Sequence, residues 1–296
     1  MKKAVKFIGW TLASLVMLGL VAAFGANVLA ERKLNRTIDV QAAAVAFVSD
    51  EASLVRGKYL FESRGCSECH GADGAGRPVI DEPNGLRVSS PNISPGPGGV
   101  VSKYTEVDWV RTIRHGVKPD KHPVFIMPSE DYNRLTDTDL AAIVAYTRSL
   151  PPVRGEAAHI ALPLLIKALY AADVIPDAAE KIDHTLPPAQ AVAEGPTPEH
   201  GAYVANMCKG CHGGSFSGGP IPGSPPDWPP AADLTAATTY ARYDSLDKFR
   251  TMLRTGKRPD GEAIKVMPFP SLGALNDTDV EALYGYLRTL PKSASR

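Results

Sequence analysis

Apolar and polar positions divide the chain into one long apolar segment at the amino terminus and two later regions with helical periodicity. The apolar segment runs from Phe7 to Ala30, 24 residues without a charged side chain. At about 1.5 Å of rise per residue it would extend about 36 Å, enough to cross the roughly 30 Å hydrocarbon core of a bilayer with some tilt. We therefore expect residues 1–35 to form an amino-terminal transmembrane helix that anchors the protein.

The residues around this segment predict its orientation. Lys2, Lys3 and Lys6 precede it, and positive residues favour the cytoplasmic side, so everything after Glu31 is expected outside. The alternative is a cleaved signal peptide, because Val28-Leu29-Ala30 presents small residues as a processing site does. Apolar regions of signal peptides usually run about 7–15 residues, so the greater length favours an uncleaved anchor. Both interpretations export the rest of the chain.

A carboxy-terminal helix is expected in each of two matching regions. Thr136 and Asn276 are the expected N-caps, each followed three residues later by an aspartate. Pro151 and Pro291 end these helices. Apolar residues recur between them with helical spacing: Leu140, Ile143, Val144 and Leu150 in the first region, and Val280, Leu283, Tyr284 and Leu290 in the second.

Two earlier helices are also expected in each region. One covers residues 105–116 or 245–256 and ends at a glycine that serves as C-cap. The other carries Gly57-Lys58-Tyr59 or Gly201-Ala202-Tyr203, where glycine would permit close approach of the terminal helix. No alternating strand pattern appears, so the fold class is predicted to be all-α with long loops.

These matching regions are copies of one unit. Residues 120–151 align without gaps on residues 260–291 at a constant offset of 140. The repeat predicts two tandem domains, residues 50–154 and 196–296. Residues 155–195 form a proline-rich linker, whose apolar stretch from Leu164 to Tyr170 is expected to dock between the domains.

The charge balance excludes one class of partner. The chain has 32 basic and 32 acidic side chains and a formal net charge of zero. Proteins that hold nucleic-acid phosphates need a one-sided positive field, which this composition does not suggest. We expect no nucleic-acid partner.

The four cysteines all fall in one motif that occurs twice. The motif is Cys-x-x-Cys-His, with Cys66, Cys69 and His70 in the first copy and Cys208, Cys211 and His212 in the second. This spacing is typical of c-type haem attachment, in which both thiols form thioethers with the haem and the histidine ligates its iron. We therefore expect two covalently bound haem c groups, one in each domain.

Two other roles for the cysteines explain less of the pattern. A zinc site needs four converging ligands, whereas each motif offers three groups with no fourth close in sequence. Two disulfides would suit an exported chain but would leave both histidines unexplained.

Met127 and Met267 are the expected second axial ligands of the two irons. Each precedes a proline, and each follows its motif histidine at nearly the same spacing, 57 and 55 residues. A methionine thioether opposite histidine raises the reduction potential and suits pure electron transfer. The alternative is that both are ordinary core residues. Their equal placement in the repeat favours ligation, whereas Met252 has no counterpart and is expected to be packing.

Secondary contacts to the ligands are also predicted. Pro78 and Pro220 each lie eight residues after a motif histidine, and a carbonyl near each is expected to accept the histidine Nδ1 proton. Simple stiffening of the loop is the alternative. The remaining histidines are expected at the surface: His115, His122, His159, His184 and His200.

The motifs resemble those of a known family. Both copies resemble class I cytochrome c domains, small helical folds with an early Cys-x-x-Cys-His and a later axial methionine. Four segments are similar to the haem subunits of membrane-associated bacterial dehydrogenases for alcohols, aldehydes or sugar acids such as gluconate: Asn92-Ile93-Ser94-Pro95, Trp109 to Gly116, Met127-Pro128 and Leu135 to Pro152. The likeness covers nearly everything after residue 50. Those subunits typically carry three haem motifs, and this chain has two.

The resemblance implies an electron carrier rather than a catalyst. It implies a protein held at the periplasmic side of the bacterial inner membrane that takes electrons from a dehydrogenase subunit. It also implies delivery to a quinol-oxidising complex, quinone or a terminal oxidase. The enzyme alternative is a dihaem peroxidase or a thiosulfate-oxidising cytochrome, where one iron has an open site. A haem-based gas sensor is the third class, for which the sequence shows no output segment.

Overall fold

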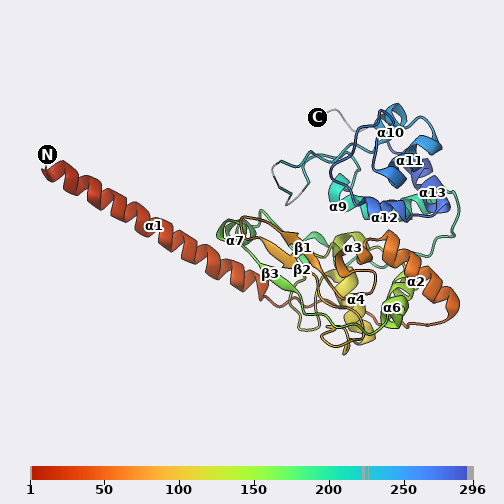
Figure 1. Ribbon diagram of the computed structural model, residues 1–296, viewed down its shortest axis with the longest axis horizontal. Coiled ribbons are helices and arrows are strands. Elements are labelled where there is room, and N and C mark those ends of the chain that lie inside the picture. The colour runs from red at the N-terminus through yellow and green to blue at the C-terminus, as the bar shows by residue number, and fades with distance from the viewer. Residues whose placement is uncertain (1, 222–223, 226, 292–296) are drawn as a thin grey trace.

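The computed structural model describes residues 2–221, 224–225 and 227–291. It is mostly helical, as the sequence predicts, and the amino-terminal part of a long helix, α1 (Lys2–Leu34), projects from the rest of the molecule (Figure 1). The first copy contains α2 (Glu51–Ser63), α3 (Cys66–His70), α4 (Glu106–His115), α5 (Ser129–Tyr132) and α6 (Asp137–Ser149). The intervening segment contains α7 (Leu164–Ala171) and a 3-10 turn, η1 (Ala179–Lys181). The second copy contains α8 (Pro198–Val204), η2 (Ala205–Cys208), α9 (Lys209–His212), α10 (Ala236–Arg242), α11 (Leu246–Thr255), α12 (Phe269–Gly273) and α13 (Asp277–Leu287).

The middle helices begin and end where the sequence places them. The Thr105 side chain accepts a hydrogen bond from the Asp108 amide at the start of α4, and the Asp108 carboxylate accepts one from the Thr105 amide. This reciprocal pair is a capping box, which satisfies two amides that the helix leaves free. Gly116 and Gly256 end α4 and α11 in the left-handed conformation that glycine adopts without strain.

Each domain is organised by the packing of its first helix on its last. Helix α2 crosses α6, and α8 crosses α13, at the two equivalent glycines. A Cβ added to Gly57 would lie 2.0 Å from the Ala142 carbonyl oxygen, and one added to Gly201 would lie 2.0 Å from that of Ala282. The predicted close approach is therefore confirmed, because only glycine leaves room for the facing backbone.

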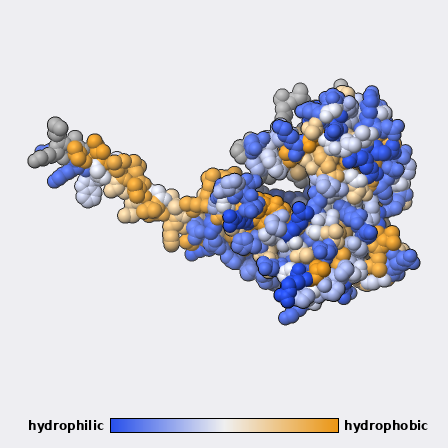
Figure 2. All heavy atoms as spheres, viewed as in Figure 1, coloured by the Kyte–Doolittle hydropathy of each residue, from blue (hydrophilic) through white to orange (hydrophobic). Residues whose placement is uncertain are grey.

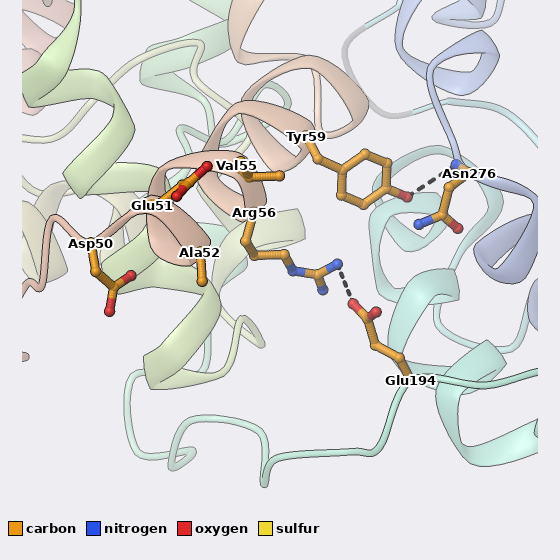
Figure 3. Close-up of a pocket in the computed structure, with 8 residues that line it drawn as sticks. All are labelled: Asp50, Glu51, Ala52, Val55, Arg56, Tyr59, Glu194 and Asn276. Atoms are coloured by element: carbon orange, nitrogen blue, oxygen red, sulfur yellow. Dashed lines mark hydrogen bonds and ion pairs between the residues drawn. The ribbon is translucent and has the colours of Figure 1, made fainter.

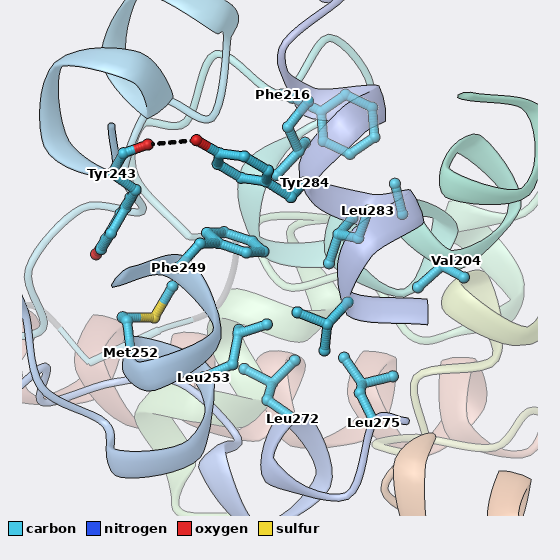
Figure 4. Close-up of a cluster of buried hydrophobic side chains, with 13 residues drawn as sticks. Val204, Phe216, Tyr243, Phe249, Met252, Leu253, Leu272, Leu275, Leu283 and Tyr284 are labelled. Atoms are coloured by element: carbon cyan, nitrogen blue, oxygen red, sulfur yellow. Dashed lines mark hydrogen bonds between the residues drawn. The ribbon is translucent and has the colours of Figure 1, made fainter. Parts of the chain in front are cut away.

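Buried apolar side chains gather around these helix pairs. In the second domain the Tyr284 hydroxyl donates to the Tyr243 carbonyl at 2.8 Å, and both rings border Phe249 (Figure 4). Met252 is 5% exposed within the same cluster, as expected for a packing residue. The first domain has a corresponding cluster built on Leu60 and Leu140, both fully buried.

A small antiparallel sheet was not expected from the sequence. It comprises β1 (Pro78–Asp81), β2 (Arg87–Ser89) and β3 (His159–Ala161), in the order β1-β2-β3. Strands of three or four residues are too short to show an alternating pattern. Because β3 follows the first domain along the chain, it ties the start of the linker back onto that domain.

The apolar stretch of the linker docks elsewhere than predicted. Helix α7 packs along the end of α1, beside the first domain, and not between the two domains (Figure 1). The reason is electrostatic as well as apolar, since Arg36, two residues after α1, forms a bidentate ion pair with the buried Asp177 at 2.6 and 2.9 Å. The Tyr170 hydroxyl donates to the same carboxylate at 2.6 Å.

The helix crossings predict the effect of filling their glycines. Gly57→Ala and Gly201→Ala should each destabilise the protein by about 1–3 kcal/mol, because the added methyl group forces the paired helices apart. Gly285→Ala is the matched control, since a Cβ there meets nothing within 4 Å and alanine favours the helix. Thermal unfolding of the haem-loaded protein measures the difference. A neutral Gly57→Ala would contradict the close crossing.

Candidate metal centres and the contact between them

Both cysteine motifs form short helical turns that present a histidine at their end. His70 is the last residue of α3, and His212 is the last residue of α9. Gly71 and Gly213 follow them with nearly equal backbone angles, φ 79° and 77°. The two motifs therefore leave their helices in the same way, as the internal repeat requires.

Each motif histidine is oriented by a backbone carbonyl. His70 Nδ1 lies 3.0 Å from the Pro91 oxygen, and His212 Nδ1 lies 2.7 Å from the Ala232 oxygen. A carbonyl can only accept, so Nδ1 carries the proton and Nε2 keeps its lone pair for a metal. The kind of contact was predicted correctly, but the carbonyls near Pro78 and Pro220 were the wrong ones. The chain folds back over the histidine some 20 residues later, which local spacing does not reveal.

Two equivalent glycines allow this fold-back. The Gly76 and Gly218 amides donate to the carbonyl oxygens of His70 and His212 at 2.9 and 3.0 Å. A Cβ on Gly76 would lie 2.8 Å from the Pro91 carbonyl carbon. Both glycines also have positive φ, so the residue type is required by conformation and by space.

The surroundings keep both histidines neutral. Burial lowers the pKa of His70 and of His212, and the carbonyl contact only partly opposes that shift. A neutral imidazole is the form that ligates a metal. The site chemistry therefore fits the ligand role expected of these histidines.

The thiols fit haem attachment better than the alternatives. All four cysteines are free, so none is consumed in a disulfide. Burial raises the pKa of Cys66 and Cys208 to about 12, whereas a redox-active dithiol needs a lowered value. Among the residues that the structure describes, no group of three or more His, Cys, Asp or Glu side chains is arranged to hold a metal ion. The donor set accordingly suits a ligand that brings its own metal.

The methionine loops share one backbone conformation. Pro128 and Pro268 have φ −78° and −79° and ψ 62° and 68°, and each opens a short helix, α5 or α12. Met127 and Met267 are half-buried and thus more exposed than the core residue Met252, although Met267 also packs against the edge of the second-domain cluster. Their pairing with His70 and His212 stays a prediction.

The two motifs lie together where the domains meet. Glu68, inside the first motif, accepts a hydrogen bond at 2.9 Å from the Ser271 amide on α12 of the second domain. Gly210, inside the second motif, donates to Asp131 on α5 of the first domain at 3.0 Å. Each motif therefore contacts the helix that follows the methionine of the other domain. This reciprocal arrangement has the pattern of a two-fold axis.

A pair of tyrosines repeats that reciprocity. Tyr59 on α2 donates to Asp279 of the second domain at 2.6 Å, and Tyr203 on α8 donates to Asp139 of the first at 2.6 Å. Each hydroxyl also accepts from the first free amide of the same helix, that of Asn276 at 3.2 Å or Thr136 at 3.3 Å. Figure 3 shows Tyr59 reaching Asn276 beside the ion pair between Arg56 and Glu194.

The two aspartates bond to the tyrosines of the opposite domain and do not form the expected capping boxes. Thr136 and Asn276 are N-caps as predicted, accepting from the amides of Asp139 and Asp279. The carboxylates do not bond back to the caps, however, because the tyrosines of the opposite domain occupy those amides. This role was not predicted, although the recurring Gly-x-Tyr at residues 57–59 and 201–203 is its signal in the sequence.

Basic side chains also bond these two carboxylates, from the same domain in the case of Arg56 and His200 and from the opposite domain in the case of Arg64. Asp139 forms a bidentate pair with Arg56 at 2.9 and 3.1 Å. Asp279 contacts His200 Nε2 at 2.7 Å and Arg64 at 3.2 Å. Burial alone would raise the pKa of Asp279, but Arg64 and the hydrogen bonds hold it below its usual value. Asp279 is therefore a charged acceptor, and hydrogen bonds to a charged group are strong.

Two histidines expected at the surface are buried. His200 is 1% exposed because it serves the interface carboxylate Asp279. His115 is 7% exposed, and its Nδ1 lies 3.1 Å from that of His184 in the linker. Neither contact could be predicted, since each joins residues about 70 or more positions apart.

Comparison with known proteins identifies the fold. The cytochrome c family profile matches residues 54–151 and, separately, residues 199–291. The chain belongs to the cytochrome c family. This cytochrome therefore carries covalently bound haem c and transfers electrons, and the resemblance noted in the sequence is confirmed.

Three relatives are named as cytochrome subunits of dehydrogenases. The cytochrome is 28% identical over 286 residues to the alcohol dehydrogenase (quinone) cytochrome c subunit of Gluconobacter oxydans, covering 84% of this chain and 57% of that protein. It is 28% identical over 273 residues to the fructose dehydrogenase cytochrome subunit of Gluconobacter japonicus, covering 82% and 53%. It is 27% identical over 290 residues to the gluconate 2-dehydrogenase cytochrome c subunit of Pantoea cypripedii, covering 84% and 62%. The chain thus spans little more than half the length of these relatives.

The reciprocal tyrosine contacts predict how the domain interface responds to the loss of one tyrosine hydroxyl. Tyr59→Phe and Tyr203→Phe should each destabilise the cytochrome by about 1–3 kcal/mol, since a buried carboxylate and a helix amide lose one partner together. Tyr240→Phe is the control, because Tyr240 is exposed on α10. Thermal unfolding of the holoprotein reports the change. Equal stabilities for all three variants would contradict a stabilising role of the two interdomain tyrosine contacts.

Asp131 predicts a pH dependence of stability. Burial, with repulsion from Glu130, raises the pKa of Asp131 to about 7. The folded state thus keeps a proton that the unfolded state releases, so this contribution to stability falls as the pH rises from about 4 to 7, by at most about 1.4 kcal/mol per unit.

Asp131→Asn should remove that slope, because the amide oxygen still accepts from Gly210 without charge. Denaturant unfolding at a series of pH values measures it. Asp81→Asn, which removes an exposed carboxylate, is the matched control. A wild-type and an Asp131→Asn profile that run parallel would contradict the assignment.

Proposed function

We propose that this cytochrome carries two haem c groups and passes single electrons between them. Cys66 and Cys69 would hold one group and Cys208 and Cys211 the other. His70 and His212 would be the proximal ligands of the two irons, and Met127 and Met267 the distal ligands. No residue is assigned a catalytic role.

One observation carries this proposal. The two Cys-x-x-Cys-His motifs are built alike. In each, the histidine Nδ1 donates to a backbone carbonyl, which reaches the histidine because an equivalent glycine lets the loop fold back. Haem supplies a reversible one-electron couple when it is bound. The residues supply the rest: each carbonyl fixes its imidazole and raises the basicity of that ring, and the unprotonated Nε2 would be left to ligate the iron.

The domain contact supports electron transfer between the two groups. Glu68 and Gly210 lie inside the attachment motifs, and both are engaged directly by the opposite domain. The haem-bearing segments are therefore held side by side by hydrogen bonds rather than joined only through the linker. A fixed, short separation is what rapid transfer between two centres requires.

We further propose that the cytochrome works at the periplasmic side of a bacterial inner membrane, anchored by α1. The helix is long and apolar enough to span a membrane, by its length and composition. The names of its relatives favour a dehydrogenase catalytic subunit as electron donor. A quinone, a quinol-oxidising complex or a terminal oxidase would then accept the electrons.

Intact mass and ligand binding test the proposal together. The mature holoprotein should exceed its polypeptide mass by two haem groups, and the same spectrum shows whether α1 is retained. Both irons should be low-spin and should not bind carbon monoxide at rest. A mass corresponding to one haem would overturn the dihaem assignment. Ready carbon monoxide binding would favour the peroxidase-like alternative.

The methionine assignment predicts a specific loss. Met127→Ala and Met267→Ala should each remove about half of the weak sulfur-to-iron absorption of the oxidised protein and lower one reduction potential, because the thioether raises the potential. Met252→Leu, in the core of α11, should change neither property. Visible spectra and potentiometric titration measure both. Retention of the full band in Met127→Ala or Met267→Ala would exclude that residue as a ligand.

A further inference from the structure

Helix α7 combines an apolar surface with a position beside the anchor. Its sequence is apolar except for Lys167, yet Leu164 is 49% exposed and Leu165 is 68% exposed. Exposed leucines that form part of a larger continuous apolar patch mark a site of interaction with protein or membrane. In Figure 2 the apolar surface of α1 continues onto the part of the protein next to α7.

The contacts between α7 and α1 fix the direction of α7. The Lys167 ammonium lies 2.7 Å from both Asn27 Oδ1 and Glu31 Oε1. One turn later, the Tyr170 carbonyl accepts from Lys33 at 3.0 Å. Later residues of α7 thus meet later residues of α1, so the two helices run parallel. The first turn of α7 consequently lies further toward the amino terminus of α1 than Asn27.

That level coincides with the edge of a bilayer. About 20 residues of helix cross the hydrocarbon core, so a span that begins at Phe7 ends near Asn27. Leu164 and Leu165 therefore stand at the level of the last turn of α1 that lipid would surround, the turn that also carries the exposed Phe24. Lys167 places no unpaired charge there, because Glu31 neutralises it at 2.7 Å.

We propose that the first turn of α7 inserts into the outer boundary of the lipid bilayer, as a second membrane contact besides α1. This inference rests on the proposed anchoring by α1. The occupant is lipid because the exposed leucines are continuous with a surface that lipid already covers. The contact would fix the first domain at one height and one orientation above the membrane.

Site-directed spin labelling tests the insertion in the full-length holoprotein, reconstituted in phosphatidylcholine–phosphatidylglycerol vesicles. Haem attachment consumes the native cysteines, so Leu165→Cys provides a single labelling site. The measurement is the accessibility of the label to oxygen, which concentrates in lipid, relative to a water-soluble nickel complex. Phe24→Cys reports on the anchor, and Glu281→Cys on the exposed face of α13 reports on water.

The Leu165 label should show an oxygen-to-nickel ratio severalfold above that at Glu281 and close to that at Phe24. A Leu165 ratio like that of Glu281, with Phe24 still in lipid, would overturn the insertion and leave the anchoring intact. Low accessibility to both reagents at Leu165 would mean that protein covers the site, which also overturns it. A Phe24 label in water would overturn the anchoring and the insertion together.

Discussion

The structure depends on two tyrosine hydroxyls that cross from one domain to the other. Tyr59 and Tyr203 each bond to a buried aspartate and to the first free amide of the helix that carries it. A helix amino terminus and a charged carboxylate are among the groups that least tolerate burial without partners. Because each domain completes the other in this way, the orientation of the two motifs follows from satisfying those groups.

The reciprocity is not a perfect symmetry. Arg56 serves Asp139 in the first domain, whereas His200 serves Asp279 in the second. Arg64, only 7% exposed, adds a charge to the interface, and the residue at its position in the second repeat is Asn206. The two halves thus share a backbone plan while their electrostatic surroundings differ. A duplicated chain can in this manner present two unlike centres.

Much of this arrangement could be predicted because it is local or repeated. The helices follow from apolar periodicity, the caps at Thr105 and Gly116 from residue type, and the motif chemistry from spacing alone. What escaped prediction depends on contacts between distant residues. Asp139 has the sequence position of a capping-box residue, and only tertiary structure shows that Tyr203 diverts it. The carbonyl of Pro91 reaches His70 for the same reason, through a loop whose course no short pattern encodes.

The end of α1 has a consequence for how such a carrier meets its partners. Arg36, Lys33 and Lys167 lock the helix to the folded body through buried or paired carboxylates. A carrier on a slack tether sweeps a hemisphere and can shuttle between distant sites. A carrier whose anchor is fixed to the folded domains keeps one height and orientation above the membrane. Electron exchange then depends on lateral diffusion and on partners whose docking surfaces lie at the same height above the membrane.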